Sequence, residues 1–194
     1  MHSKEIEING LQVRATRITY VGELGWELYI PVDKALGIWE SLHKAGGFPC
    51  GYRAIESLRL EKGNLAWGGE INTENNPYEA GLSFAISKKK NNFYGHTALQ
   101  NLKNPKRKLV AITFDDIRQV PIGSEPIRIG NDVVGRIKSG GQGYSIGKAI
   151  GYAYLPIEYS APGTDLEVEF FGNWVSGKIS ATPLYDPAGV KVKS

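Results

Sequence analysis

Six short stretches rich in apolar and β-branched residues follow one another in the second half of the chain, and this pattern constrains the fold most. Turns separate the stretches, and no convincing amphipathic helix lies among them. Gly130-Asn131 and Gly172-Asn173 fit tight hairpin turns. Short strands at this spacing are typical of a small barrel or sandwich. The expected strands cover residues 109–114, 126–129, 133–137, 146–154, 166–171 and 174–180.

The first stretch of the chain has the alternation of a β-hairpin. Residues 12–20 place Val13 and Ala15 on one face, and residues 26–31 alternate in the same way. The intervening residues 20–25 contain two glycines, which relieve the backbone constraint of a turn. We therefore expect two paired strands with Glu23 in the turn between them.

Helical spacing follows the hairpin. Asp33 is a suitable N-cap for a first helix, which Gly46-Gly47 would end, and a second helix is expected over residues 52–62 with Gly63 as its stop. A short strand over residues 82–86 and a small helix over residues 97–102 complete this half. The apolar residues at helical spacing are Ala35, Ile38, Trp39 and Leu42 in the first helix, and Ile55 and Leu58, expected to face inward, in the second.

The chain is long enough for one domain or two small ones, because it has 194 residues. The best linker candidate is the proline-containing, charged stretch at residues 104–108. The predicted fold class is therefore α+β for residues 1–104, followed by an all-β unit at residues 106–194.

Composition excludes several classes of protein. The 23 Lys and Arg nearly balance the 20 Asp and Glu, so neither a nucleic-acid surface nor a nucleic-acid partner is expected. One cysteine, Cys50, excludes an internal disulfide framework and a cysteine-rich metal fold. No apolar run reaches the ~20 residues of a membrane span, and residues 1–7 lack the apolar core of a secretory signal. We expect a cytoplasmic protein without a membrane partner.

Catalytic signatures are sparse. The three histidines are scattered without metal-ligand spacing, so no metal site is expected. The glycine-rich residues 140–148 lack the pattern of a phosphate-binding loop and are better explained as turns between strands. Arg53 and Arg59 lie six positions apart on the predicted helix, about 240° around its axis, so they cannot face one partner. One of them could point into a cleft while the other pairs with an acidic neighbour.

Four ordered blocks of the sequence resemble one family. Residues 17–29 (RITYVGELGWELY) look like the Y-x-G-E-x-G-x-E segment of the glycine-cleavage T-protein family, and residues 52–63 (YRAIESLRLEKG) are similar to its A-R-x-S-L-R-L-E-x-G helix. The WGGE and NPYEAGL blocks at residues 67–82 and the PLYDP block at residues 183–187 complete the match. These versions look most like the folate-binding C-terminal portions of dimethylglycine oxidase and sarcosine dehydrogenase.

The resemblance implies a fold and an activity. Residues 1–104 would be the second half of the folate-binding α+β domain, and residues 106–194 the small C-terminal β-barrel. Members of the family bind tetrahydrofolate and transfer a one-carbon unit to it. T-protein takes the carbon from an aminomethyl group on a lipoyl protein, whereas the oxidase relatives capture an iminium or formaldehyde. The expected function is a tetrahydrofolate-binding component of such a one-carbon transfer system.

The resemblance also implies site residues. Glu23 matches the glutamate that binds the pterin ring, whose amino-pyrimidinone edge offers adjacent N–H donors to a carboxylate. Arg53 matches the arginine that contacts the glutamate carboxylate of folate. Tyr20 and Trp67 are candidates for walls beside the ligand, and Tyr185 is a further candidate.

One departure from the family shapes the remaining expectations. Relatives carry an N-terminal half with an aspartate near folate N5, and no segment of this sequence matches it. We therefore expect no catalytic residue within this chain and little activity from it alone. Its first domain would pair with an N-terminal-half polypeptide, with a dehydrogenase subunit, or with a second copy through its exposed sheet edge. The alternative is a non-catalytic folate-binding, assembly or regulatory module that retains only the fold.

Overall fold

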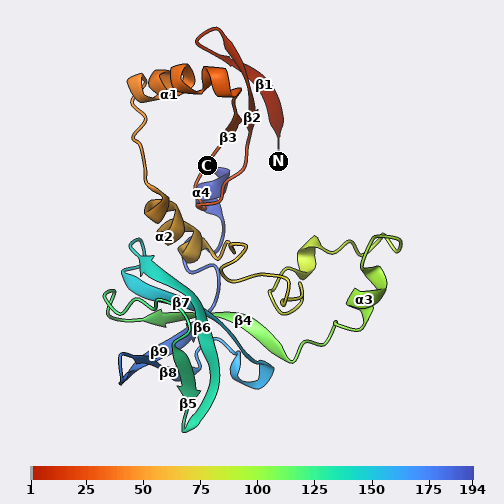
Figure 1. The fold of residues 1–194 in the computed structure, drawn as a ribbon, viewed down its shortest axis with the longest axis vertical. Coiled ribbons are helices and arrows are strands. Elements are labelled where there is room, and N and C mark those ends of the chain that lie inside the picture. Colours follow the sequence, from red (N-terminus) through yellow and green to blue (C-terminus); the bar gives the residue numbers. More distant parts are fainter. Residues whose placement is uncertain (1) are drawn as a thin grey trace.

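A computed structural model describes residues 2–194 and shows an N-terminal lobe, a barrel and a projecting arm. Helix α2 (Tyr52–Lys62) lies between the lobe and the barrel, and the arm carries helix α3 (His96–Gln100) away from both (Figure 1). The expected α+β half followed by an all-β half is confirmed. Among the helices of residues 2–194, none is long and apolar enough to span a bilayer.

The N-terminal lobe contains a three-stranded antiparallel sheet in the order β1-β2-β3. Its strands are β1 (Ser3–Ile8), β2 (Leu11–Thr16) and β3 (Glu27–Tyr29). The predicted hairpin is confirmed, because Ala15 pairs with Leu28, and Val13 and Ala15 are both buried. Sequence reasoning missed β1, although the Asn9-Gly10 dipeptide that turns it into β2 is a strong hairpin signal.

Helix α1 (Ala35–Lys44) lies beside this sheet and buries only Ile38 among its own residues. Ile38 is fully buried, whereas Leu36, Trp39 and Leu42 are exposed. The expected N-cap at Asp33 is wrong, because Asp33 lies in a 3-10 turn (Val32–Lys34) that precedes the helix.

Helix α2 has the predicted bounds. It ends at Gly63, whose φ of 76° is in the left-handed region that glycine adopts without strain. The predicted inward face is confirmed only in part, because Ile55 and Leu58 are half-buried. The fully buried residues of the helix are Ser57, Arg59, Leu60 and Glu61. Polar partners on the barrel and in the following loop make the burial of these polar side chains favourable.

The arm follows the loop after α2. The strand expected at residues 82–86 is wrong, because a 3-10 turn (Ser83–Ala85) forms there and Phe84 is 82% exposed. A buried strand needs a neighbouring strand to satisfy its backbone groups, and this segment has none among the described residues. The small helix expected at residues 97–102 is present as α3, shifted by one residue at its start.

The second half forms a closed six-stranded antiparallel barrel in the order β4-β7-β6-β5-β8-β9. Side chains inside the barrel, including Ile112, Phe114 and Val168, make its core. A short helix, α4 (Val190–Lys193), follows near the C-terminus. The strands are β4 (Arg107–Phe114), β5 (Pro126–Ile129), β6 (Asp132–Gly143), β7 (Lys148–Pro156), β8 (Asp165–Phe170) and β9 (Asn173–Ser180).

Two details of the barrel differ from expectation. Strand β4 begins at Arg107, inside the stretch expected to be a linker. Residues 140–143 belong to strand β6 rather than to a turn, and Gly140 pairs with Gly151 of β7. Glycine is needed at position 140 because a Cβ there would lie 2.5 Å from the Pro121 carbonyl oxygen.

Candidate functional site

Helix α2 organises the region that holds the predicted site residues, because its buried face is fastened to the barrel. Ser57 Oγ donates a hydrogen bond to the Gln142 carbonyl oxygen at 2.5 Å. The Tyr152 hydroxyl donates to the Leu60 carbonyl oxygen at 2.8 Å. Burial raises the pKa of the Tyr152 hydroxyl, which keeps it in the neutral, donating form. These bonds set the position of α2 on the barrel surface.

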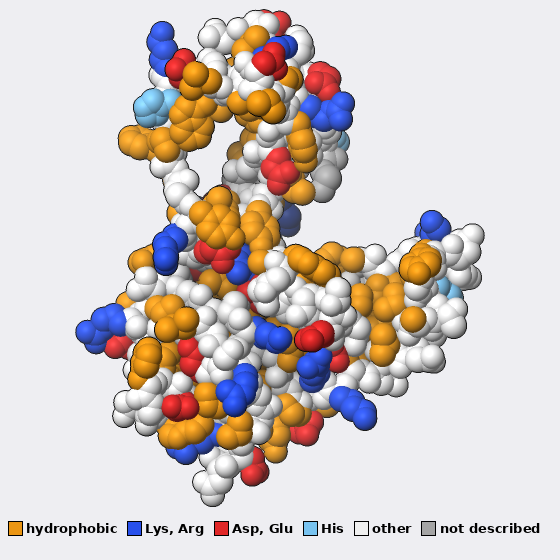
Figure 2. Space-filling view, in the orientation of Figure 1, with side chains coloured by type: hydrophobic (Ala, Val, Ile, Leu, Met, Phe, Trp, Pro, Cys, Tyr) orange, Lys and Arg blue, Asp and Glu red, His pale blue; other side chains and the backbone are white. Residues whose placement is uncertain are grey.

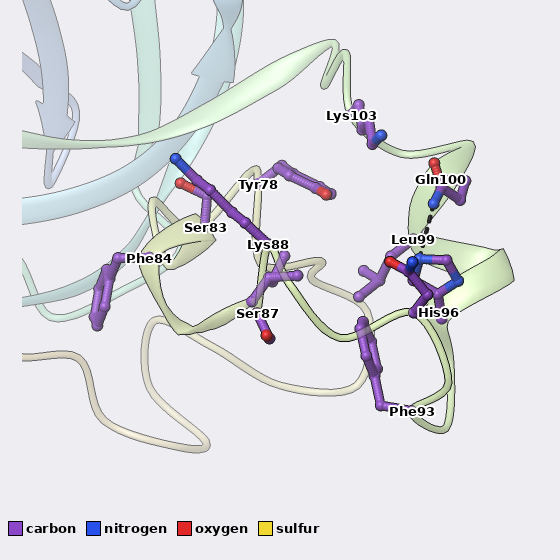
Figure 3. Close-up of a pocket in the computed structure, with 12 residues that line it drawn as sticks. Tyr78, Ser83, Phe84, Ser87, Lys88, Phe93, His96, Leu99, Gln100 and Lys103 are labelled. Atoms are coloured by element: carbon purple, nitrogen blue, oxygen red, sulfur yellow. Dashed lines mark hydrogen bonds between the residues drawn. The ribbon is translucent and has the colours of Figure 1, made fainter.

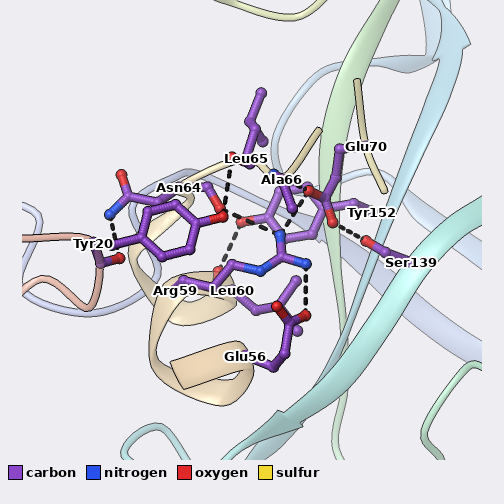
Figure 4. Close-up of polar contacts among 10 residues, drawn as sticks. All are labelled: Tyr20, Glu56, Arg59, Leu60, Asn64, Leu65, Ala66, Glu70, Ser139 and Tyr152. Atoms are coloured by element: carbon purple, nitrogen blue, oxygen red, sulfur yellow. Dashed lines mark hydrogen bonds and ion pairs between the residues drawn. The ribbon is translucent and has the colours of Figure 1, made fainter. Parts of the chain in front are cut away.

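A buried ion-pair network fixes the loop that follows α2 (Figure 4). Arg59 Nη1 lies 2.6 Å from Glu70 Oε2, and Arg59 Nη2 lies 2.8 Å from Glu56 Oε2. The Glu70 carboxylate also accepts the Ala66 N–H at 2.7 Å and the Ser139 hydroxyl. Burial alone would lower the pKa of Arg59, but its hydrogen bonds to Glu56 and Glu70 outweigh burial and raise it. Arg59 is therefore a charged structural residue. Of the two expected arginine roles, it has that of pairing with an acidic neighbour.

Glu23 lies in the turn between β2 and β3, and this turn rests on the C-terminal end of α2. Gly22 has a φ of 80°, and a Cβ there would lie 2.6 Å from Lys62 Cδ. Glu23 itself is half-buried. The Glu23 carboxylate lies close enough to the Tyr185 hydroxyl to raise its pKa. The structure therefore brings together two predicted site residues that are far apart in the sequence.

Tyr20 joins the same turn to the loop after α2. Its hydroxyl donates to the Leu65 carbonyl oxygen at 3.1 Å, and Asn64 Nδ2 donates to the Tyr20 carbonyl oxygen at 2.7 Å (Figure 4). Burial is the main cause that raises the pKa of the Tyr20 hydroxyl. Trp67 lies further along this loop and is 72% exposed. Tyr20 thus has a structural role in addition to any contact with a ligand.

Arg53 lies at the opposite end of α2 from the Glu23 turn. Its side chain is exposed and lines a surface hollow of about 460 Å³ between α2 and the barrel, together with Tyr52, Gln142 and Tyr144. Lys62 lies nine positions after Arg53 in the helix, which corresponds to about 14 Å along the axis. The predicted site residues therefore divide into a group at the C-terminal end of α2 and one cation near its N-terminal end.

A larger hollow in the arm contains none of the predicted site residues (Figure 3). It measures about 680 Å³ and is lined by aromatic and polar side chains, among them Phe84, Lys88, Phe93 and His96. Gln100 Nε2 and His96 Nε2 lie 2.9 Å apart, and the ring of Phe93 packs edge-on against that of His96.

Sequence reasoning missed three charged residues that support the site. Glu70 lies in the WGGE block, and its full burial beside Arg59 depends on a loop that the sequence pattern does not specify. Lys62 and Asp186 form an ion pair of 3.1 Å between the end of α2 and the C-terminal segment. Lys62 and Asp186 lie within two of the sequence blocks that resemble the family, and this position is the signal that could have identified them.

Comparison with known proteins places this geometry in a family. The chain is similar to the crystal structure of the glycine cleavage system aminomethyltransferase T from Bartonella henselae, with a TM-score of 0.84 and 27% identity, over 90% of this chain and 50% of that one. It is 39% identical over 193 residues to the mitochondrial dimethylglycine dehydrogenase of Rattus norvegicus, and 37% identical over 191 residues to the aminomethyltransferase of Symbiobacterium thermophilum.

These alignments cover 95% and 94% of this chain but 22% and 51% of the two relatives, so the chain spans about half the length of that aminomethyltransferase. Two family models match the chain: the GCVT N-terminal domain over residues 1–90, and the glycine cleavage T-protein C-terminal barrel domain over residues 107–186. The chain therefore belongs to the glycine-cleavage T-protein family, of which the aminomethyltransferases are members.

Proposed function

We propose that the chain is the tetrahydrofolate-binding part of a one-carbon transfer system of the aminomethyltransferase or dimethylglycine dehydrogenase kind. The position of Glu23 carries this proposal, because its turn packs on the C-terminal end of helix α2 through Gly22 and brings its carboxylate near Tyr185. Glu23 has no cationic partner in the ion pairs among residues 2–194, and it is half-buried, so its carboxylate has acceptor capacity left for a ligand.

The chemistry of tetrahydrofolate fits the two ends of α2. A pterin presents adjacent N–H donors that a carboxylate such as that of Glu23 accepts as a pair. The glutamate tail of folate ends in carboxylates, for which the exposed guanidinium of Arg53 is suited. Two exposed rings offer further apolar surface: that of Trp67 in the loop after α2, and that of Tyr52 beside Arg53.

Bound tetrahydrofolate would supply its N5 as the nucleophile toward an iminium carbon. The residues of this chain would hold and orient the pterin, because Glu23 and Tyr185 are fixed on α2 before binding. No residue of the chain is assigned a proton-transfer step.

A partner polypeptide belongs to the same proposal. Among residues 2–104, five apolar side chains are buried, whereas fourteen large apolar side chains are exposed. Figure 2 shows hydrophobic side chains at the surface of the N-terminal lobe. Strands β1 and β3 are the two edges of the N-terminal sheet, and neither pairs with a further strand among the described residues. Such surfaces favour association. We propose that this lobe packs against a second polypeptide, equivalent to the remaining half of an aminomethyltransferase.

Calorimetric titration of tetrahydrofolate into the chain tests the binding site, with and without the N-terminal half of a related aminomethyltransferase. Glu23→Gln should weaken binding by about tenfold or more, since hydrogen bonds to a charged group contribute ~1.5–3 kcal/mol. Glu27→Gln is a matched control, because Glu27 lies in the same hairpin and also accepts a tyrosine hydroxyl, that of Tyr29, at 3.1 Å.

Three outcomes decide the proposal. Binding that Glu23→Gln weakens and Glu27→Gln leaves unchanged supports it. The absence of binding by the wild-type chain, alone and with the partner half, would refute it. Binding without any one-carbon transfer in the reconstituted system would reduce the function to a non-catalytic folate-binding module.

A further inference from the structure

The C-terminal segment after the barrel is fastened to the last turn of α2 by backbone and side-chain bonds. The Glu61 carbonyl oxygen accepts the N–H groups of Leu184 and Tyr185 at 2.9 and 3.0 Å. Lys62 Nζ donates to the Asp186 carbonyl oxygen at 2.8 Å and lies 3.1 Å from Asp186 Oδ2. The two side chains are 11% and 10% exposed, so the ion pair is largely removed from water.

Asp186 is held in an unusual backbone conformation. Its φ is 45°, which is costly for a residue with a Cβ and persists only where neighbouring contacts fix it. Its carboxylate also accepts the N–H groups of Val190 and Lys191 at 2.9 and 3.1 Å, at the start of α4. Burial alone would raise the pKa of Asp186, but the hydrogen bonds from Lys62 and from these N–H groups lower it. The carboxylate is therefore ionised at neutral pH.

The methylene groups of Lys62 contact a second segment, the turn between β2 and β3 that carries Glu23. The turn that carries Glu23 packs on it through Gly22, where a Cβ would lie 2.6 Å from Lys62 Cδ and 2.7 Å from Cγ. One side chain thus contacts the Glu23 turn with its methylene groups and the Tyr185–Asp186 segment with its ammonium group. The Tyr185 backbone N–H is held by the Glu61 carbonyl oxygen at 3.0 Å, and its hydroxyl lies close enough to the Glu23 carboxylate for that carboxylate to raise its pKa.

We propose that the Lys62–Asp186 pair is a latch that positions Glu23 and Tyr185 for ligand binding without contacting the ligand. The identity of that ligand rests on the proposed function, whereas the latch itself rests on the contacts above. The methylene groups of Lys62 fix the position of the Glu23 turn on α2. Asp186, paired with Lys62, fixes the neighbouring Tyr185 beside that turn. Both are positioning residues, because they act through Glu23 and Tyr185.

A double-mutant cycle tests the latch in the full chain. Asp186→Asn and Lys62→Met each remove one charge, and Lys62→Met keeps most of the stem under Gly22. Each should increase hydrogen exchange at the amides of residues 20–25, and each should weaken tetrahydrofolate binding by about tenfold. The double variant should be no worse than either single variant, because the second substitution removes the partner of a bond already lost.

Two controls separate positioning from general damage. Lys62→Arg keeps the charge and the stem, and it should restore most of the protection at residues 20–25. Asp116→Asn breaks the exposed ion pair with Arg118 on the barrel, and it should leave both exchange and binding unchanged. The barrel amides report whether each variant folds, and their protection should not change in any of them.

The exchange measurement distinguishes failure of the latch from failure of the proposed function. If the wild-type chain does not bind tetrahydrofolate but Asp186→Asn still loosens residues 20–25, the ligand is wrong and the latch stands. If the variants protect residues 20–25 as the wild type does, or if the double variant loses the sum of both single effects, the latch is overturned.

Discussion

Replacing Glu70 by glutamine should destabilise the fold far more than breaking a surface ion pair of similar length. Glu70 is fully buried, and its carboxylate holds Arg59, the Ala66 N–H and the Ser139 hydroxyl. Glutamine keeps the shape but leaves the buried guanidinium of Arg59 without one of its two carboxylates. Removing one partner of a buried pair costs ~3–5 kcal/mol. Because Glu56 remains as a half-exposed partner, we expect a loss near the lower end, about 3 kcal/mol.

Urea unfolding followed by circular dichroism measures this loss, provided that the slope against urea is unchanged. Glu5→Gln is the control, because the Arg14–Glu5 pair is of similar length, 2.8 Å against 2.6 Å for Arg59–Glu70, but both of its side chains are more than half exposed. It should cost less than ~1 kcal/mol. The double variant Arg59→Met/Glu70→Leu should be more stable than Glu70→Gln, since it leaves no unpaired buried charge. The reasoning fails if Glu70→Gln costs no more than Glu5→Gln.

Two further predictions concern the barrel and α1. Burial raises the pKa of Tyr154 to about 12, above the ordinary value of 10.0, so its neutral form stabilises the fold below pH 10, and this contribution is lost as pH rises through about 12. Tyr154→Phe should therefore reduce the alkaline loss of stability, measured as the urea midpoint against pH; an identical profile would contradict this. Gly140→Ala should destabilise the barrel, because its Cβ would meet the Pro121 carbonyl oxygen at 2.5 Å. Gly37→Ala should instead stabilise α1 by ~0.5–1 kcal/mol, because Gly37 is exposed in a helix with no close contact; melting temperatures that move in the same direction would refute this contrast.

Local signals predicted the elements that local chemistry controls. The bounds of α2 and β5 were predicted as observed, because Gly63 stops the helix and Gly130-Asn131 turns the strand. The strand expected at residues 82–86 failed because an apolar run forms a strand only where a neighbour pairs with it. The inward face of α2 was predicted only in part for a related reason, since Arg59 and Glu61 are buried by partners that lie elsewhere in the sequence.

The candidate site was predicted in part. The resemblance supplied Glu23, Arg53, Tyr20, Trp67 and Tyr185, and their role in binding stays a prediction. The structure adds that Glu23 lies near Tyr185, whereas Arg53 lies at the far end of α2. It also adds the supporting charges Glu70, Lys62 and Asp186, whose partners become visible only when the loop and the C-terminal segment are folded onto α2.

The sequence by itself determined the strand-rich second half, the helix α2 and the family, because turn residues, periodicity and ordered motifs act over short stretches of chain. The tertiary structure decided how the barrel closes, with β4 beside β9, and which charges are buried. It also decided that the turn carrying Glu23 meets Tyr185 across the end of α2. These features depend on free energies of burial and pairing between distant segments, which no local pattern encodes.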